Sequence, residues 1–192
     1  MGKKGLLPSG YTQVEYIENT STAYINTGVN GALSNSYEIK FSVTNLTAKQ
    51  VVFGDWYPQI TSQLVFSKDN NTIRYYVGDL DMCTIPLDVL PHIMIYNGIT
   101  KTGALDGVSI GNVAKKTSGQ VQYLFAANRS DVTKREYGKC RGYYCKMESN
   151  GEPVRNYIPC ISPTNVVGMY DTVEGKFYSS PNGVAFVAGP VV

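Results

Sequence analysis

The segment Tyr37-Glu38-Ile39-Lys40-Phe41-Ser42-Val43 decides the fold class, because its large apolar residues stand at every second position. Successive side chains of a β-strand point to opposite faces, so this period of two predicts a strand with one buried and one solvated face. Shorter segments of strand character follow at 50–53, 63–67, 72–77, 93–96, 107–110, 122–127, 142–148 and 183–188. No window keeps a helical period for two turns, and at most one helical turn is expected, at 86–90.

Asn-Gly and Asp-Gly pairs punctuate the chain, at Asn30-Gly31, Asn97-Gly98, Asp106-Gly107, Asn150-Gly151 and Asn182-Gly183. Both residues of such a pair tolerate the positive φ that a tight hairpin turn requires, so the pairs predict hairpins. We therefore expect an all-β protein, a two-sheet antiparallel jelly-roll sandwich. No repeat or linker composition divides the chain, which predicts residues 1–5 as a short extension and residues 6–192 as one domain.

Composition argues against several classes of partner. The 192 residues carry 17 basic and 15 acidic side chains, a net charge of +2, which is too weak a field to hold nucleic acid or an anionic membrane. No run of about 18 apolar residues is present, so no membrane-spanning helix is predicted. The first residues lack the apolar stretch of a secretory signal, so we expect folding in a reducing cytoplasm.

The cysteines indicate buried free thiols. Cys83, Cys140, Cys145 and Cys160 show no Cys-x-x-Cys spacing, and only His92 could add an imidazole to a metal site. A reducing compartment and a domain of this size make disulfides unnecessary. We expect no metal and no cofactor.

Strand alternation makes a specific prediction for the segment 140–147. It assigns Tyr143, Cys145 and Met147 to one face, with Cys145 as a core thiol, and assigns Tyr144 and Lys146 to the other face. One member of each of the pairs Tyr75-Tyr76 and Tyr143-Tyr144 is then exposed, where tyrosine suits an interface.

Candidate catalytic groups are sparse, and we predict that the chain is not an enzyme. A glycoside hydrolase needs two carboxylates, and Asp79 with Asp81 offers a pair without a third acid nearby. A polar strand end is the simpler interpretation, and a calcium site at these two residues is the other. His92 follows Pro91 and precedes an apolar run, which indicates the start of a strand rather than a catalytic base.

The candidate ligand-binding residues are Asp55, Trp56 and Tyr57, in a predicted loop between Gly54 and Pro58. An aromatic face beside a carboxylate suits a sugar, which needs apolar stacking and directed hydrogen bonds. The alternative is that Trp56 packs over the mouth of the sandwich or against another subunit.

Both ends of the chain resemble one family. The opening segment, Leu7-Pro8-Ser9-Gly10-Tyr11-Thr12-Gln13-Val14-Glu15-Tyr16-Ile17-Glu18-Asn19-Thr20 and then Ala23-Tyr24-Ile25-Asn26-Thr27-Gly28-Val29, resembles the start of a domain found in bacteriophage virion proteins and in related bacterial surface or prophage proteins. The closing half is similar to the same family over 143–147, 149–151, 154–160, 167–171 and 175–178, and at Phe186 and Gly189. The middle, 45–116, is similar only in general character.

The resemblance implies a concanavalin A-like or laminin G-like sandwich in which the first and last segments pair as neighbouring strands. It further implies a bacteriophage virion structural protein, an accessory decoration component of the capsid or tail, with other virion proteins as partners and cell-surface glycans as a further ligand. The alternative is a carbohydrate-binding adhesion module for host recognition. Self-association into a homo-oligomer is left open, and neither nucleic acid nor a membrane is an expected partner.

Overall fold

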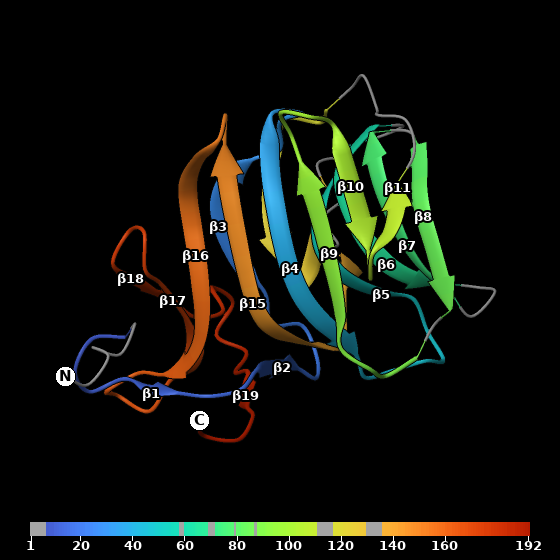
Figure 1. Cartoon of the computed structure of the whole chain (residues 1–192). Coiled ribbons are helices and arrows are strands. Elements are labelled where there is room, and N and C mark those ends of the chain that lie inside the picture. Colours follow the sequence, from blue (N-terminus) through green and yellow to red (C-terminus); the bar gives the residue numbers. More distant parts are fainter. Residues whose placement is uncertain are drawn as a thin grey trace.

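A computed structural model describes residues 7–57, 60–68, 72–78, 80–86, 88–110, 117–129 and 136–192, without the side chains of 57, 60–68, 74–78, 80–84 and 110. Two large β-sheets face each other and no helix occurs in these ranges, which confirms the predicted all-β sandwich (Figure 1). None of the described residues forms a helix of the length and apolarity needed to cross a bilayer.

The larger sheet has eleven strands, which come from three parts of the chain, 12–43, 92–110 and 140–188. Its main path is, in spatial order, β11 (Val108–Ile110), β10 (Thr102–Leu105), β9 (His92–Asn97), β4 (Asn35–Val43), β15 (Cys140–Ser149), β16 (Glu152–Ile161), β17 (Val167–Asp171) and β18 (Lys176–Tyr178). The remaining strands are β1 (Thr12–Gln13), which pairs with β16, and β2 (Ile17–Asn19), which pairs with β15 and with β19 (Val187–Ala188).

The smaller sheet has eight strands. Its main path is β14 (Glu136–Tyr137), β13 (Ala126–Arg129), β5 (Gln50–Tyr57), β6 (Ile60–Lys68), β7 (Thr72–Gly78) and β8 (Leu80–Pro86). β12 (Val121–Leu124) pairs with β5 and with β3 (Ile25–Asn30). The chain crosses between the sheets from β2 to β3, β3 to β4, β4 to β5, β8 to β9, β11 to β12 and β14 to β15, as the strands of a jelly roll do.

The last strand, β19, lies beside β2, as the resemblance implied for the closing and opening segments (Figure 1). Val187 and Ala188 of β19 pair with β2, and Val14 bridges Val191. These short pairings join the last residues of the chain to its first strands within the larger sheet.

The core lies between the two sheets and is built by the alternating residues that the sequence predicted. Tyr37, Ile39, Phe41 and Val43 of β4 are each at most 2% exposed, and Phe53 from the smaller sheet contacts the Tyr37 ring at 5.2 Å between centroids. Burying each large apolar side chain stabilises the fold by roughly 1.5–3 kcal/mol.

Some of the predicted hairpins form at the Asn-Gly and Asp-Gly pairs, and others do not. Asn150-Gly151 and Asp106-Gly107 both adopt positive φ and join adjacent strands through two-residue turns. Asn97-Gly98 begins a longer hairpin loop between β9 and β10. The prediction was wrong at Asn30-Gly31, which leads from one sheet to the other, and at Asn182-Gly183, which lies in the connection from β18 to β19.

Candidate functional site

The predicted ligand-binding residues lie on a strand rather than in a loop. β5 continues through Tyr57, and consecutive strand residues point to opposite faces. Asp55 is 0% exposed, and its Oδ1 accepts a 3.2 Å hydrogen bond from Nε2 of Gln122. Asp55 therefore belongs to the interior, and the proposed pairing of its carboxylate with the Trp56 ring at one surface site is wrong. The side chain of Tyr57 lies outside the described residues.

Trp56 is partly exposed and stacks on a cation. The guanidinium carbon of Arg129 lies 4.0 Å from the centre of the Trp56 ring. Arg129 and Lys49 both donate to the carboxylate of Glu136. Burial acts to raise the pKa of Glu136, but the hydrogen bond and charge of Lys49 and the charge of Arg129 outweigh it, so this pKa lies below its ordinary value. This arrangement favours the packing interpretation of Trp56.

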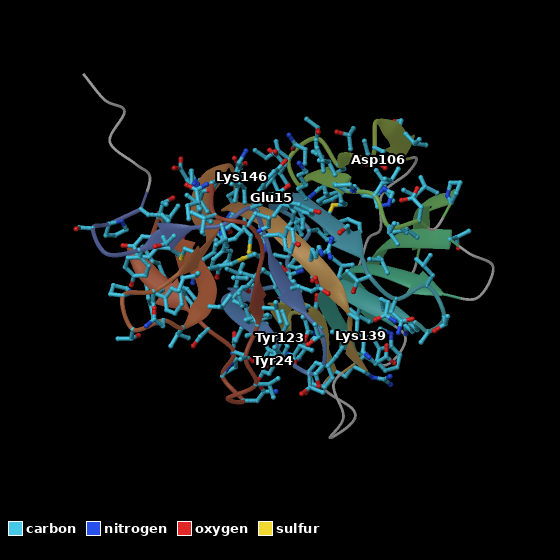
Figure 2. The ribbon with its side chains drawn as sticks, turned by 90° about the horizontal axis from the view of Figure 1, so that it is seen from below. Glu15, Tyr24, Asp106, Tyr123, Lys139 and Lys146 are labelled. Atoms are coloured by element: carbon cyan, nitrogen blue, oxygen red, sulfur yellow. The ribbon has the colours of Figure 1, made fainter. Side chains whose placement is uncertain are left out.

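A second group of aromatic side chains on the same sheet packs together and leaves little ring surface exposed. The Tyr24 ring contacts the rings of Tyr123 and Tyr137, with centroid distances of 4.9 and 6.2 Å. Tyr24 and Tyr123 are only 5% and 7% exposed. Figure 2 shows both on the side of the sandwich opposite Lys146. Rings that bury one another leave little face for a ligand, so this cluster stabilises the fold.

The outer face of the larger sheet carries half-buried tyrosines, and a β-bulge brings Tyr143 to that face. Between β4 and β15, Gly142 pairs with Phe41 and Tyr144 with Lys40, which leaves Tyr143 as the extra residue. Tyr143 therefore lies on the outer face near Tyr144, not on the core face with Cys145. The predicted face of Tyr143 was wrong, whereas Cys145 is a core thiol as predicted.

Cations stack on these tyrosines across the outer face of the larger sheet. The Lys40 Nζ lies 5.0 Å from the Tyr143 ring centre, and the Tyr16 ring lies 5.5 Å from the same ring. The Arg141 guanidinium carbon lies 4.6 Å from the Tyr16 ring centre. We call this set the aromatic row; it consists of Tyr16, Lys40, Arg141, Tyr143, Tyr144 and Lys146.

Carboxylates hold the row in place. Glu38 accepts from the Tyr144 hydroxyl at 2.8 Å and from Lys146 at 3.1 Å, and Glu18 accepts from Nε of Arg141 at 2.8 Å. Partial burial and the hydrogen bond to Glu38 raise the pKa of Tyr144 to about 12. Beside these groups lies a hollow of about 160 Å³, partly lined by Ile95, which is 46% exposed. The row is thus an ordered, half-exposed surface of aromatic faces and compensated charges.

His92, the histidine considered as a catalytic base, occupies a structural position. His92 begins β9, as predicted, and is 4% exposed. Its Nδ1 lies 2.6 Å from Oδ2 of Asp106, and its Nε2 lies 3.2 Å from Oδ1 of Asp88 without hydrogen-bond geometry. The imidazole thus ties the segment before β9 to the hairpin of β10 and β11. Asp79 and the side chain of Asp81 lie outside the described residues.

The described thiols agree with the predicted free state. Cys140, Cys145 and Cys160 are free and buried, and burial raises the pKa of Cys160 to about 11. Burial also raises the pKa of Cys140 and Cys145 well above the ordinary value. No group of three His, Cys, Asp or Glu side chains with metal-binding spacing occurs in the part of the chain that the structure describes. The side chain of Cys83 lies outside that part.

Sequence reasoning missed the aromatic row as a unit. Its members are residues 16 and 40 and residues within 141–146. Those of β4 and β15 come together only through the pairing of these two strands and its bulge. The one available signal was the adjacent pair Tyr143-Tyr144, but strict alternation sends its members to opposite faces.

Comparisons with known proteins identify no family for this chain. No protein-family description matches the chain, and no curated protein matches it. Among solved structures, a mutant of Trypanosoma rangeli sialidase displaying trans-sialidase activity is similar at 10% identity, with a TM-score of 0.44. The match covers 62% of this chain and 21% of the sialidase chain, so this chain spans about a fifth of that protein. A similarity this weak carries no argument about activity.

Proposed function

We propose that this chain is a structural protein of a bacteriophage virion, an accessory decoration component of the capsid or tail that attaches to the particle through the aromatic row. The observation that carries the proposal is the placement of Tyr16, Tyr143 and Tyr144 with their stacked cations on the outer face of the larger sheet. The proposed site of synthesis is the cytoplasm of the host bacterium.

The chemistry of the row supports a protein partner. Tyrosine and arginine are enriched at the energetic centres of protein interfaces, because each buries a large rigid surface and still forms hydrogen bonds. Arg141 and Lys146 are already oriented by Glu18 and Glu38, which lowers the entropy lost on binding. Lys40, stacked on Tyr143, faces the same surface. A partner surface with carboxylates and backbone carbonyls would complement these donors.

The resemblance of both chain ends to virion domains supports the proposed virion role. The pairing of β2 with β19 agrees with that resemblance. The alternative, a carbohydrate-binding adhesion module for host recognition, would place the main contact in a sugar site instead of on the sheet face.

The test is incorporation into particles. A phage that encodes the chain is propagated with the wild-type gene or with Tyr143→Ala/Tyr144→Ala, and particles are banded by density. Mass spectrometry then gives the amount of the chain relative to the major capsid protein. We expect the wild type in the particles and at least about tenfold less of the double variant, since two interface tyrosines are removed.

The matched control is Lys176→Ala, an exposed change away from the row, which should leave incorporation unchanged. Circular dichroism melting of each purified variant shows whether it is folded. Absence of the wild-type chain from banded particles would overturn the virion role. Full incorporation of a folded double variant would overturn the row as the attachment surface.

A further inference from the structure

The Asn-Gly pairs of the chain share one reactive chemistry but lie in different surroundings. In such a pair, the backbone nitrogen of the glycine attacks Cγ of the asparagine side chain once this nitrogen has lost its proton to solvent. Glycine favours the attack because it has no Cβ to obstruct the approach and its backbone adopts a wide range of conformations. The pairs are Asn30-Gly31, Asn97-Gly98, Asn150-Gly151 and Asn182-Gly183.

Hydrogen bonds occupy the glycine nitrogen in three of these pairs. The N–H of Gly31 donates at 2.8 Å to the carbonyl of Gln120, and that of Gly183 donates at 3.3 Å to the carbonyl three positions earlier. The N–H of Gly98 donates at 3.1 Å to Oγ of Ser36. An N–H that is bonded within the protein exchanges its proton with water only when that bond opens, so these nitrogens are protected in the folded state.

The asparagine side chain is also held in two of the protected pairs. Oδ1 of Asn97 accepts hydrogen bonds from the backbone N–H groups of Ile99 and Thr100, each at 2.9 Å. Nδ2 of Asn182 donates at 2.8 Å to the carbonyl of Thr22, and Oδ1 of Asn182 accepts two further hydrogen bonds. Both side chains must give up these bonds before Cγ turns towards the following nitrogen.

Asn150-Gly151 differs from the other pairs in both respects. The pair forms the two-residue turn that joins β15 to β16, where Ser149 pairs with Glu152 (Figure 1). Both turn residues are exposed. Neither the Asn150 side chain nor the Gly151 nitrogen makes a hydrogen bond to any residue that the structure describes. The backbone N–H of Asn150 donates at 3.3 Å to the carbonyl of Ser34, which anchors the turn without engaging either reacting atom.

We propose that Asn150 is a site of spontaneous deamidation in the folded protein, and that hydrogen bonds protect the other Asn-Gly pairs. The Gly151 nitrogen gives its proton to solvent and forms a bond to Cγ of Asn150. The Cγ–Nδ2 bond breaks, and Nδ2 takes a proton from solvent and leaves as ammonia, so that a succinimide ring remains. Water then adds to either ring carbonyl and opens the ring to aspartate or isoaspartate. Water is the only other reactant, and no electrons are transferred.

The two products affect the hairpin differently. Aspartate adds a negative charge and still tolerates the φ of +53° that Asn150 adopts. Isoaspartate takes the main chain through the side-chain methylene, so the turn becomes longer and loses the geometry that lets Ser149 pair with Glu152. The isoaspartyl form should therefore melt at a lower temperature than the aspartyl form. The inference is independent of the virion role, because neither Asn150 nor Gly151 belongs to the aromatic row.

The experiment follows every Asn-Gly pair in one sample. The folded protein is incubated in mildly alkaline buffer, which favours loss of the glycine proton. Aliquots are digested at acidic pH and analysed by mass spectrometry with fragmentation that distinguishes aspartate from isoaspartate. We expect products at Asn150 to accumulate at least about tenfold faster than at any other pair, because the others must first break one or more hydrogen bonds. In guanidinium the rates should converge, because unfolding removes those bonds.

Two matched variants test the assignment by a second readout, the growth of acidic species on ion-exchange chromatography. Asn150→Asp should remove most of this growth. Asn30→Asp makes the same change at an exposed asparagine of a protected pair and should leave the growth as in the wild type. Circular dichroism melting shows whether each variant is folded, and the rates at the individual sites of the wild type do not depend on either variant.

Equal rates at all pairs in the folded protein, or a faster rate at a protected pair, would overturn the inference. A preference for Asn150 that persists unchanged in guanidinium would also overturn it, because the cause would then lie in the local sequence and not in the hydrogen bonds of the fold.

Discussion

The Tyr37 hydroxyl donates a 2.6 Å hydrogen bond to Oε1 of Gln122, and the Nε2 of Gln122 donates in turn to Asp55. These three residues come from β4 of the larger sheet and from β12 and β5 of the smaller one. They form a buried polar connection between the two sheets. Burial raises the pKa of Tyr37 well above its ordinary value, so the hydroxyl stays protonated as a donor.

Replacing Tyr37 with Phe should destabilise the protein by about 1–3 kcal/mol, because the amide oxygen of Gln122 then stays buried without its donor. Urea unfolding followed by circular dichroism measures the change. Tyr144→Phe, which removes a half-exposed hydroxyl from the surface, is the matched control and should cost less. Equal stability of Tyr37→Phe and the wild type would show that the connection contributes nothing.

Two glycines of the larger sheet should not accept alanine. A Cβ on Gly168 would lie 2.2 Å from the backbone oxygen of Tyr178, and a Cβ on Gly142 would lie 2.8 Å from Cζ of Phe125. Each substitution should cost about 1–3 kcal/mol, with Gly168→Ala the worse because a backbone atom cannot move aside as a side chain can. Thermal melting ranks the variants. Gly107→Asn is the control: a Cβ on Gly107 would meet nothing within 4 Å, and asparagine tolerates the positive φ at this position. Its melting temperature should be close to that of the wild type.

The buried thiols should be unreactive in the folded protein. In Cys83→Ser, the remaining Cys140, Cys145 and Cys160 are buried and their pKa values are raised, so little thiolate forms. A colorimetric thiol reagent at neutral pH should detect none of them until guanidinium is added, and then all three. Rapid reaction of one thiol in the folded protein would contradict its burial.

Stability should fall at alkaline pH. Burial, assisted by Glu38 and Glu174 respectively, raises the pKa of Tyr144 and Tyr178 from 10.0 to about 12. Each raised pKa adds to the free energy of unfolding, and this contribution is complete below pH 10. It is lost as the pH rises towards 12, because these tyrosines ionise at lower pH in the unfolded chain than in the folded protein. The melting temperature should therefore decrease progressively across this interval. Tyr144→Phe should show a shallower decrease, and a melting temperature unchanged over the interval would contradict the shifts.

Local patterns predicted much of the fold. The alternation at 37–43 became β4 with the expected buried residues, and Asn150-Gly151 became a two-residue hairpin. The pair Asn30-Gly31 has the same turn chemistry, yet it leads to the opposite sheet. Turn residues permit a tight turn but do not impose it, since neither Asn30 nor Gly31 adopts positive φ. The choice of the neighbouring strand depends on contacts between distant segments.

The candidate sites were less predictable. Asp55 and Trp56 were expected side by side at a surface, but Asp55 points into the core because β5 continues past the expected loop. A hollow at the end of the sandwich joins Asn26 of β3 to Arg155, Glu174 and Tyr178, which lie far along the chain and which no local pattern connects to it.

The sequence by itself determined the all-β class, the hairpins at Asp106-Gly107 and Asn150-Gly151, and the burial of Cys145, because each follows from period-two alternation or from residues that adopt positive φ. The tertiary structure alone decided which strands became neighbours, the bulge that turns Tyr143 outward, and the meeting of Arg155 with β3. These features depend on the register and packing of strands far apart in the chain, where the energy of many weak contacts outweighs local preference.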